Sequence, residues 1–306
     1  MIRAYIQQHL WNNGKEKTAK LALKVLTTVP PDYLDEKFEI EEEADITKRL
    51  GIIGGLGPLA TAYFYELITR MTDAKTDQEH IEAIIFSKPT IPDRTAYIIG
   101  KSWRNPIYDM LEAGQLLVNM GVELIAIPCI TAHYYYDTLS EKIKVPVIHV
   151  VRETARYLKA NGVRCAGILA SEGTIRSGLF QKELDLSEIK MVIPKEDKQQ
   201  QITDMIYQCI KADKPIDFKV FCSCSEQLRE DGAEVIILGC TELSLIKRDF
   251  MLGPGFLDAM EVLAMRAVLS SEARLKEDYT SLITDGTAGK VYDNAEKYNG
   301  ILGANC

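Results

Sequence analysis

The sequence lacks three features that would each indicate a particular class of protein. No segment approaches the roughly 20 consecutive apolar residues of a membrane helix. No basic cluster stands out, because 36 Lys and Arg residues are outnumbered by 44 Asp and Glu, a formal net charge of -8. The first residues carry charged and amide side chains, unlike the apolar core of a signal peptide. We therefore expect a cytoplasmic protein that binds neither a membrane nor a nucleic acid.

Metal-ligating residues are also sparse. The four histidines are scattered, and the pair Cys222 and Cys224 is too closely spaced for ordinary zinc binding and has no second pair. The seven cysteines are odd in number and lack the spacing of a small disulfide-bonded domain, which indicates a reducing compartment. No motif for a lysine-bound cofactor is evident. We expect neither a metal ion nor an organic cofactor.

Two stretches of the chain repeat one design. Gly121–Cys129 and Gly232–Cys240 each begin with Gly, carry Glu two places later, continue with aliphatic residues and close on Cys at the ninth place. Such a β-rich apolar run predicts a strand buried on both faces of a parallel sheet. Each cysteine then lies at the carboxyl end of its strand, where open α/β sheets bind ligands. The repeat predicts a site with one thiol on each side of a substrate.

The alternative is that both cysteines are small core residues, since free cysteine is among the most buried side chains. Their matched positions favour chemistry instead. Thr131 comes soon after Cys129, and Thr241 and Glu242 follow Cys240, as polar residues suited to the start of a helix. A helix N-terminus there would favour a thiolate and lower the thiol pKa from about 8.5.

Strands and helices alternate along most of the chain. This order predicts right-handed βαβ units, and so an α/β fold of two pseudo-symmetric lobes, each with a parallel sheet flanked by helices, with an active-site cleft between them. We expect the first lobe at residues 50–155 and the second at residues 156–260. Residues 261–306 would form a C-terminal helix that packs back on the first lobe, plus a tail. Residues 1–49 show helical patterns and then an acidic linker, which predicts an N-terminal helical extension.

Three local predictions concern the elements beside the cleft. We expect a helix over residues 131–144, a strand over 145–149 and a helix over 201–211. His133 lies one turn beyond Cys129, where we expect a structural hydrogen-bonding role.

A glycine-rich turn follows the first predicted strand. Gly55, Gly57 and Ala60 match the dinucleotide-binding pattern G-x-G-x-x-A, but no strand ends in an acidic residue about 20 positions later, where a ribose would bind. We therefore rank an NAD-dependent enzyme last. A turn whose backbone N–H groups approach a small anion fits better, which makes Gly57 a candidate substrate-binding residue.

Arg94 lies in a loop stiffened by two prolines after the second predicted strand. An arginine held there would bind a carboxylate through two N–H groups. The alternative is a surface arginine paired with Asp93.

Two facing thiols suit the inversion of a carbon centre. Removing a proton from one face and returning one to the other needs two groups, one starting as base and the other as acid. In a dry cleft one thiol can be ionised while its partner stays neutral. Preorganised donors and the exclusion of water would then stabilise the carbanion.

Four motifs follow one another in the chain: GIIGGLGPLAT at residues 51–61, IPDRT at 91–95, PCITAH at 128–133 and GCTEL at 239–243. In this combination, over roughly residues 50 to 270, the chain resembles the aspartate racemase branch of the aspartate/glutamate racemase superfamily. The resemblance implies a cofactor-independent racemase of two lobes, usually a homodimer, that acts on a small acidic amino acid. It implies that Cys129 and Cys240 are the two bases.

The resemblance also implies the substrate-binding residues. Arg94 and Lys211, the latter at the end of the segment IYQCIK, would bind the side-chain carboxylate. The other candidates are Gly57, Ile130, Thr131, Thr241 and Glu242.

Ile130 departs from the family pattern. The family usually has Asn after the first catalytic Cys, where its amide helps to hold the α-carboxylate. An isoleucine side chain makes no hydrogen bond, so one contact is missing or supplied elsewhere, at a cost of about 1 to 3 kcal/mol.

Two further functions stay open beside an aspartate racemase. One is a dicarboxylate cis-trans isomerase of the same superfamily, in which one thiol acts as a nucleophile. The other is a degenerate amino-acid-binding protein, a hypothesis motivated by Ile130.

Overall fold

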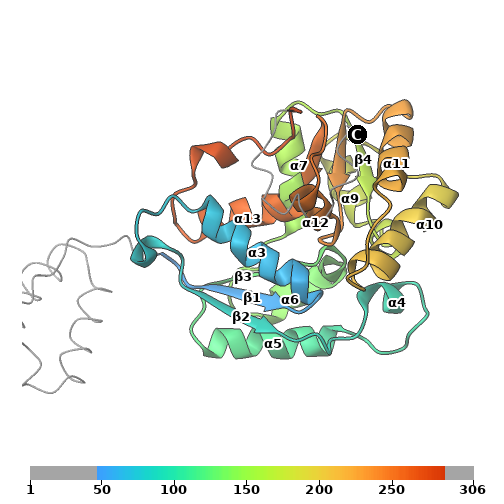
Figure 1. Cartoon of the computed structure of the whole chain (residues 1–306). Coiled ribbons are helices and arrows are strands. Elements are labelled where there is room, and N and C mark those ends of the chain that lie inside the picture. Colours follow the sequence, from blue (N-terminus) through green and yellow to red (C-terminus); the bar gives the residue numbers. More distant parts are fainter. Residues whose placement is uncertain (1–46, 287–306) are drawn as a thin grey trace, which may run out of the picture. The chain divides into compact units, whose positions relative to one another are not determined.

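Two parallel β-sheets form the centre of the structure, a computed structural model that describes residues 47–286 (Figure 1). The first sheet has the strand order β2-β1-β3 and the second the order β5-β4-β6-β7, and all neighbouring strands are parallel. The predicted α/β fold with a parallel sheet in each lobe is confirmed. The strands are β1 (Leu50–Gly54), β2 (Ala83–Ser87), β3 (Leu124–Ala126), β4 (Cys165–Leu169), β5 (Lys190–Val192), β6 (Val235–Leu238) and β7 (Phe256–Asp258).

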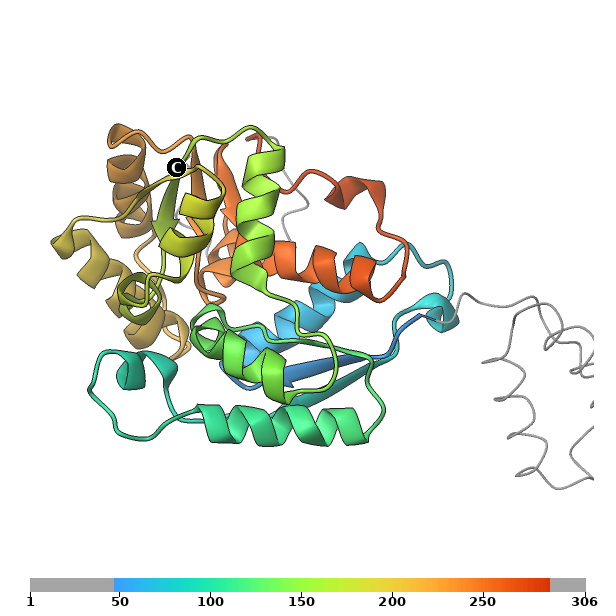
Figure 2. The same ribbon diagram turned by 180° about the vertical axis from the view of Figure 1, so that it is seen from behind.

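Helices flank both sheets, as the view from behind also shows (Figure 2). The predicted N-terminal extension, up to residue 46, and the tail after residue 286 lie outside the described residues. The α-helices are α3 (Pro58–Met71), α4 (Arg94–Ile98), α5 (Ile107–Asn119), α6 (Tyr136–Lys142), α7 (Val150–Ala160), α8 (Glu172–Arg176), α9 (Leu179–Leu186), α10 (Glu196–Asp204), α11 (Phe218–Glu230), α12 (Leu243–Asp249) and α13 (Ala259–Ser270). The other helical segments are the 3₁₀ segments η3 (Asp77–Glu79), η4 (Ile130–Tyr135) and η6 (Glu277–Tyr279) and the π-helix η5 (Met205–Ile210).

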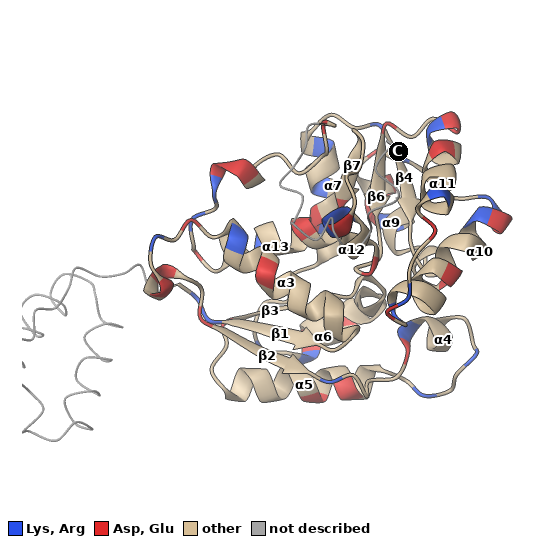
Figure 3. Cartoon of the chain, in the orientation of Figure 1, with Lys and Arg blue, Asp and Glu red and all other residues tan. Residues whose placement is uncertain are grey.

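The alternation of side chains along β1 explains why this strand is apolar throughout. Leu50 and Ile52 belong to the same buried cluster as Phe64 of α3, whereas Ile53 belongs to a second cluster with Met110 of α5. Successive residues of a strand point to opposite faces, so a sheet covered on both sides needs apolar residues at every position. The strands β1, β3 and β6 carry no charged residue, and charges lie mainly on helices and loops, with both signs interspersed (Figure 3).

Helix α13 connects the two lobes. It packs against α3 and against α7, the light green helix in Figure 2. The buried cluster that contains β1 continues through α13 to β4 and β6, so the lobes share one apolar core. The Asp258 side chain caps α13 by accepting a hydrogen bond from Met260 N. The lobe boundaries at residues 155 and 260 stay a prediction.

Three predicted elements differ from the structure in detail. The strand predicted over residues 145–149 does not form: Val147 makes a single bridge to Ile125, because Pro146 has no N–H to donate and α7 begins at Val150. The helix predicted over 131–144 divides into the 3₁₀ segment η4 and α6. The helix predicted over 201–211 begins earlier, as α10, and continues as η5, a π-helix.

No helix within residues 47–286 is both long enough and apolar enough to cross a membrane.

Candidate active site

The structure brings the two repeated cysteines into one cavity between the lobes, called here the thiol cavity. Cys129 follows the last residue of β3 by three positions and Cys240 follows that of β6 by two, so both lie at the carboxyl edges of their sheets. They are 5% and 7% exposed. Eight of the nine predicted site residues line this cavity: Arg94, Cys129, Ile130, Thr131, Lys211, Cys240, Thr241 and Glu242.

The thiol cavity is nearly filled by its own side chains. About 10 Å³ is open to the centre of a water molecule, which is the room for a single water. A larger space beside it, the outer chamber, offers about 620 Å³ by the same measure. Arg94, Lys211 and Glu242 line both spaces. The outer chamber is therefore the approach to the thiols.

Gly57, the ninth predicted site residue, lies in the glycine turn and lines the outer chamber instead of the thiol cavity. A Cβ atom on Gly57 would lie 3.2 Å from Glu242 Oε1, so a side chain here would press on the site. Gly55 has a φ of 85°, and a Cβ there would lie 2.6 Å from the backbone N of Lys88. Only glycine fits this turn, which brings the start of α3 close to the second lobe.

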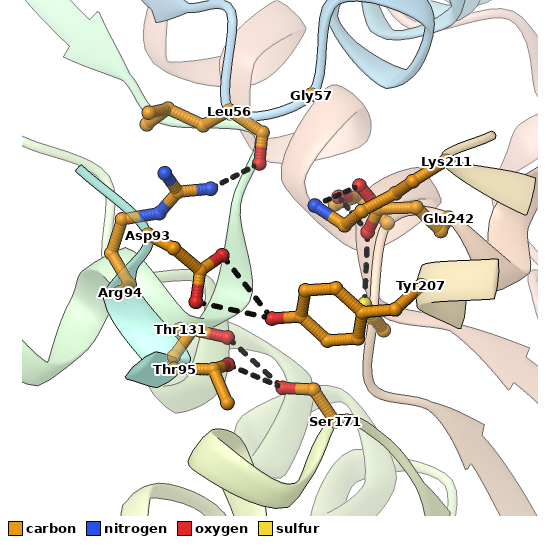
Figure 4. Close-up of polar contacts among 12 residues, drawn as sticks. Leu56, Gly57, Asp93, Arg94, Thr95, Thr131, Ser171, Tyr207, Lys211 and Glu242 are labelled. Atoms are coloured by element: carbon orange, nitrogen blue, oxygen red, sulfur yellow. Dashed lines mark hydrogen bonds and ion pairs between the residues drawn. The ribbon is translucent and has the colours of Figure 1, made fainter. Parts of the chain in front are cut away.

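Cys240 is hydrogen-bonded to an acidic residue. Its Sγ donates to Glu242 Oε2 at 2.9 Å, and Glu242 Oε1 lies 2.9 Å from Lys211 Nζ (Figure 4). Burial, and then the negative charge of Glu242, raise the pKa of Cys240 well above its ordinary value. Burial and Glu242 therefore hold Cys240 as a neutral thiol, so the lowered pKa expected from a helix N-terminus is wrong for this cysteine.

Cys129 has a cation beside it. Arg94 is only 7% exposed, and its guanidinium donates to the carbonyl of Leu56 at 2.7 Å (Figure 4) and to that of Pro92 at 3.1 Å. Burial opposes the charge of Arg94, but the charges of a Cys129 thiolate and of Asp93 outweigh it and raise the pKa of Arg94. The alternative of a surface arginine is thus wrong. The Arg94 cation thus acts on Cys129, whereas the strongest charge acting on Cys240 is that of Glu242, ahead of the opposing charge of Lys211.

Four buried hydroxyl groups connect the lobes next to the thiols. Thr131 Oγ1 lies 2.9 Å from Thr174 Oγ1 and 3.3 Å from Ser171 Oγ, and Thr95 Oγ1 lies 3.4 Å from Ser171 Oγ. Thr95 and Thr131 come from the first lobe and the other two from the second. The sequence analysis missed Ser171, although it comes two positions after the end of β4 and so lies at the same sheet edge as Cys240.

Asp93 and Tyr207 were also missed as site residues. Tyr207, on the π-helix η5, donates its hydroxyl to Asp93 Oδ2 at 3.3 Å across the cleft (Figure 4). Lys211 Nζ lies 5.3 Å from the centre of the Tyr207 ring. The motifs contain both residues, but no pattern in the sequence indicates that the two side chains meet.

Ile130 lines the cavity and is 2% exposed. It belongs to the apolar cluster that includes Ile148 and Val150, so packing between the lobes accounts for a large aliphatic residue here. No side-chain amide lines the cavity among the described residues.

His133 has a structural environment. Its ring nitrogens lie 3.0 Å and 3.1 Å from the backbone carbonyls of Cys129 and Ile148, and burial lowers its pKa. Within residues 47–286, no three His, Cys, Asp or Glu side chains are placed to hold a metal ion.

Two α/β lobes, each with a parallel sheet, present a buried thiol at matching strand ends of one cavity, so the chain is of the two-lobed α/β class. The model of the Asp/Glu/hydantoin racemase family matches residues 53–267 of this chain. The chain therefore belongs to this family, which confirms the resemblance inferred from the motifs, and it is an isomerase of the amino-acid racemase type.

Three relatives have low sequence identity to this chain, but the matched region spans at least three quarters of each of them. The broad specificity amino-acid racemase RacX of Bacillus subtilis is 27% identical over 201 residues, 64% of this chain and 86% of that protein. A glutamate racemase of a Carnobacterium strain is 23% identical over 206 residues, 64% of this chain and 75% of that protein. Among solved structures, the aspartate racemase of Picrophilus torridus is 28% identical with a TM-score of 0.67, covering 76% of this chain and 97% of that chain.

Proposed function

We propose that this protein is a cofactor-independent racemase that interconverts L- and D-aspartate by transferring the α-proton between two thiols. The observation that carries the proposal is the contrast between the two buried cysteines. Cys129 lies beside the Arg94 cation, whereas Cys240 donates a hydrogen bond to the Glu242 carboxylate. A two-base reaction needs this contrast, because one group must begin as base and the other as acid.

The proton balance follows from these positions. The Cys129 thiolate removes the α-proton from one face of the substrate, and the electron pair stays on the α-carbon. The Cys240 thiol then delivers its proton to the opposite face. Cys129 ends as a thiol and Cys240 as a thiolate. The positive charge of Lys211, which pairs with Glu242, then stabilises the Cys240 thiolate. Proton exchange with solvent restores the starting state, and the opposite enantiomer reacts in the reverse direction.

The cavity has the properties needed to stabilise a carbanion without a cofactor. Its polar groups are held in place by hydrogen bonds, and the space for water is very small. Fixed dipoles in a dry cavity stabilise a developing charge more strongly than water does, because they need not reorganise. We therefore expect the reaction to proceed without pyridoxal phosphate or a metal ion.

Two cations support a substrate with a second carboxylate. Arg94 Nε is buried and has no hydrogen-bond partner among the described residues, so it has a donor to offer an anion. Lys211 is in one ion pair, with Glu242, and an ammonium group has three donors. The likeness to the Picrophilus aspartate racemase also supports aspartate. A homodimer and a cytoplasmic location stay predictions.

One experiment tests the proposal. Purified protein is incubated with L-aspartate or D-aspartate in D₂O, and optical inversion and α-deuteration are followed by chiral chromatography and NMR. Wild type should invert both enantiomers, and addition of EDTA should not change the rate. Cys129→Ala and Cys240→Ala should both lose inversion, and each should exchange the α-proton of only one enantiomer, the opposite one in each variant.

Cys165→Ala provides the matched control. Cys165 is equally buried but begins β4, at the amino end of the second sheet, so its loss should leave inversion unchanged. Wild-type inversion by either cavity variant would refute the two-thiol mechanism. Conversion of maleate to fumarate without α-deuteration of aspartate would instead favour the cis-trans isomerase. Aspartate binding without either reaction would favour the binding protein.

A further inference from the structure

An amino-acid substrate carries a positive ammonium group on the carbon that is inverted. Burying such a group without an anionic acceptor is costly, so the thiol cavity must provide one. Two carboxylates line this cavity among the described residues, those of Asp93 and Glu242. One of these two carboxylates should therefore accept the substrate ammonium group.

Both oxygens of Glu242 already have partners. Oε2 accepts the hydrogen bond from Cys240, and Oε1 lies 2.9 Å from the Lys211 ammonium. A substrate ammonium bound here would compete with Lys211 for Oε1 and with the Cys240 thiol for Oε2. Glu242 is therefore a poor acceptor.

Asp93 has an oxygen that is only weakly used. Its Oδ1 accepts a hydrogen bond from Ala96 N at 2.7 Å, which caps α4, and a longer one from the Tyr207 hydroxyl at 3.4 Å. Its Oδ2 has one hydrogen bond, from the Tyr207 hydroxyl at 3.3 Å, which is long for an O–H···O bond. Asp93 lines both the thiol cavity and the outer chamber, so an incoming substrate reaches it on the way to the thiols.

We propose that Asp93 binds the α-ammonium group of the substrate and that the Tyr207 hydroxyl competes for the same carboxylate. This inference rests on the proposed amino-acid racemase function and adds a binding role for a residue next to Arg94. The ammonium on Asp93 and a carboxylate on Arg94 Nε would lie side by side, because the two residues are adjacent at the start of α4. Asp93 would also explain a preference for amino acids over acids that lack the amino group.

Displacing the Tyr207 hydroxyl from Asp93 would also free the Tyr207 side chain to move. Its side chain reaches across the cleft to Asp93, between the first lobe and the Glu242–Lys211 pair (Figure 4). The thiol cavity holds about one water, so an amino acid cannot reach both thiols unless a lining side chain moves. Displacement of the hydroxyl from Asp93 by an ammonium group would release Tyr207. The π-helix that carries Tyr207 is a rare geometry often found at functional sites, which fits this role.

The test compares aspartate with succinate, which has the same two carboxylates but no ammonium group. Binding is measured by calorimetry on the full chain carrying Cys129→Ala and Cys240→Ala, so that no reaction interferes. Asp93→Asn in this background should weaken aspartate binding by about 10- to 100-fold, the effect of losing one charged hydrogen bond. Succinate binding should change by less than about threefold. The variant should fold, because Asn caps a helix about as well as Asp.

Two further variants complete the design. Asp213→Asn makes the same chemical change at a residue that lines the outer chamber but not the thiol cavity, and it should leave the ratio of the two affinities unchanged. Tyr207→Phe removes the competing hydroxyl and should strengthen aspartate binding, not weaken it.

The outcomes separate this inference from the function on which it rests. An unchanged aspartate-to-succinate ratio in Asp93→Asn, with aspartate racemised by wild type, would overturn the role of Asp93 alone. Weaker aspartate binding by Tyr207→Phe would overturn the competition between the hydroxyl and the ammonium group. If neither aspartate nor succinate bound, and wild type racemised no aspartate, the proposed function would fail and this inference with it.

Discussion

Replacing Arg94 with alanine gives the most direct test of the electrostatic contrast between the thiols. The guanidinium is buried, donates to the carbonyls of Leu56 and Pro92, and lies beside Cys129. Losing a desolvated, charge-assisted contact costs roughly 2–5 kcal/mol, which is about a 30- to 5000-fold loss in kcat/KM. The loss should be present for both enantiomers, because Arg94 acts on the thiolate and on the bound carboxylate in either direction.

The assay for Arg94→Ala is the initial rate of aspartate racemisation, with thermal unfolding of the same samples. The three lost backbone hydrogen bonds, to Ile91, Pro92 and Leu56, should cost roughly 1.5–4.5 kcal/mol of stability, so assays belong well below the unfolding temperature. Arg94→Lys keeps the charge but not the fork of donors, and it should recover part of the activity. Lys101→Ala, at an exposed residue outside the cavity, is the control. Rates for Arg94→Ala within about threefold of that control would refute the reasoning.

Three other perturbations have expected outcomes. Glu242→Gln removes a negative charge that raises the pKa of Cys240, so peptide mapping should show faster alkylation of Cys240 by iodoacetamide at about pH 8, with less racemisation. Unchanged alkylation would argue against the pairing. Ile130→Asn should raise turnover by about 10-fold, or shift substrate preference, if a missing amide limits the reaction; identical steady-state kinetics would remove the motive for the binding-protein hypothesis. Burial, and then Glu261, raise the pKa of Asp258 from 3.8 to about 7. The folded state then holds a proton that the unfolded state has lost, so the free energy of unfolding should fall as pH rises from about 4 to 7. Chemical denaturation should show a flatter dependence for Asp258→Asn, and an equal slope would contradict the assignment.

Local patterns in the sequence were sufficient for the framework of the site. The apolar runs that end at Cys129 and Cys240 predict buried parallel strands, and the topology of such sheets places their carboxyl ends at the ligand-binding edge. The turn at Gly55 could be predicted for a similar reason, since a tight approach of backbone to backbone needs glycine. These predictions succeed because each depends on the order and type of residues within a short segment.

The tertiary structure alone decided which polar side chains meet. Asp93 and Tyr207 are 114 positions apart and come from different lobes, and the hydrogen bond between Thr131 and Thr174 also crosses the cleft. Such contacts depend on how the two lobes pack around α13, which no local periodicity encodes. Arg94, for which the sequence left a surface position open, is buried and donates to backbone carbonyls of its own lobe, one of them 38 positions away at Leu56. The sequence by itself therefore determined that the two thiols lie at matching strand ends and that Glu242 lies close to Cys240. Only the folded structure decided that Arg94 lies beside Cys129, and only the packing of the lobes decided that Tyr207 meets Asp93.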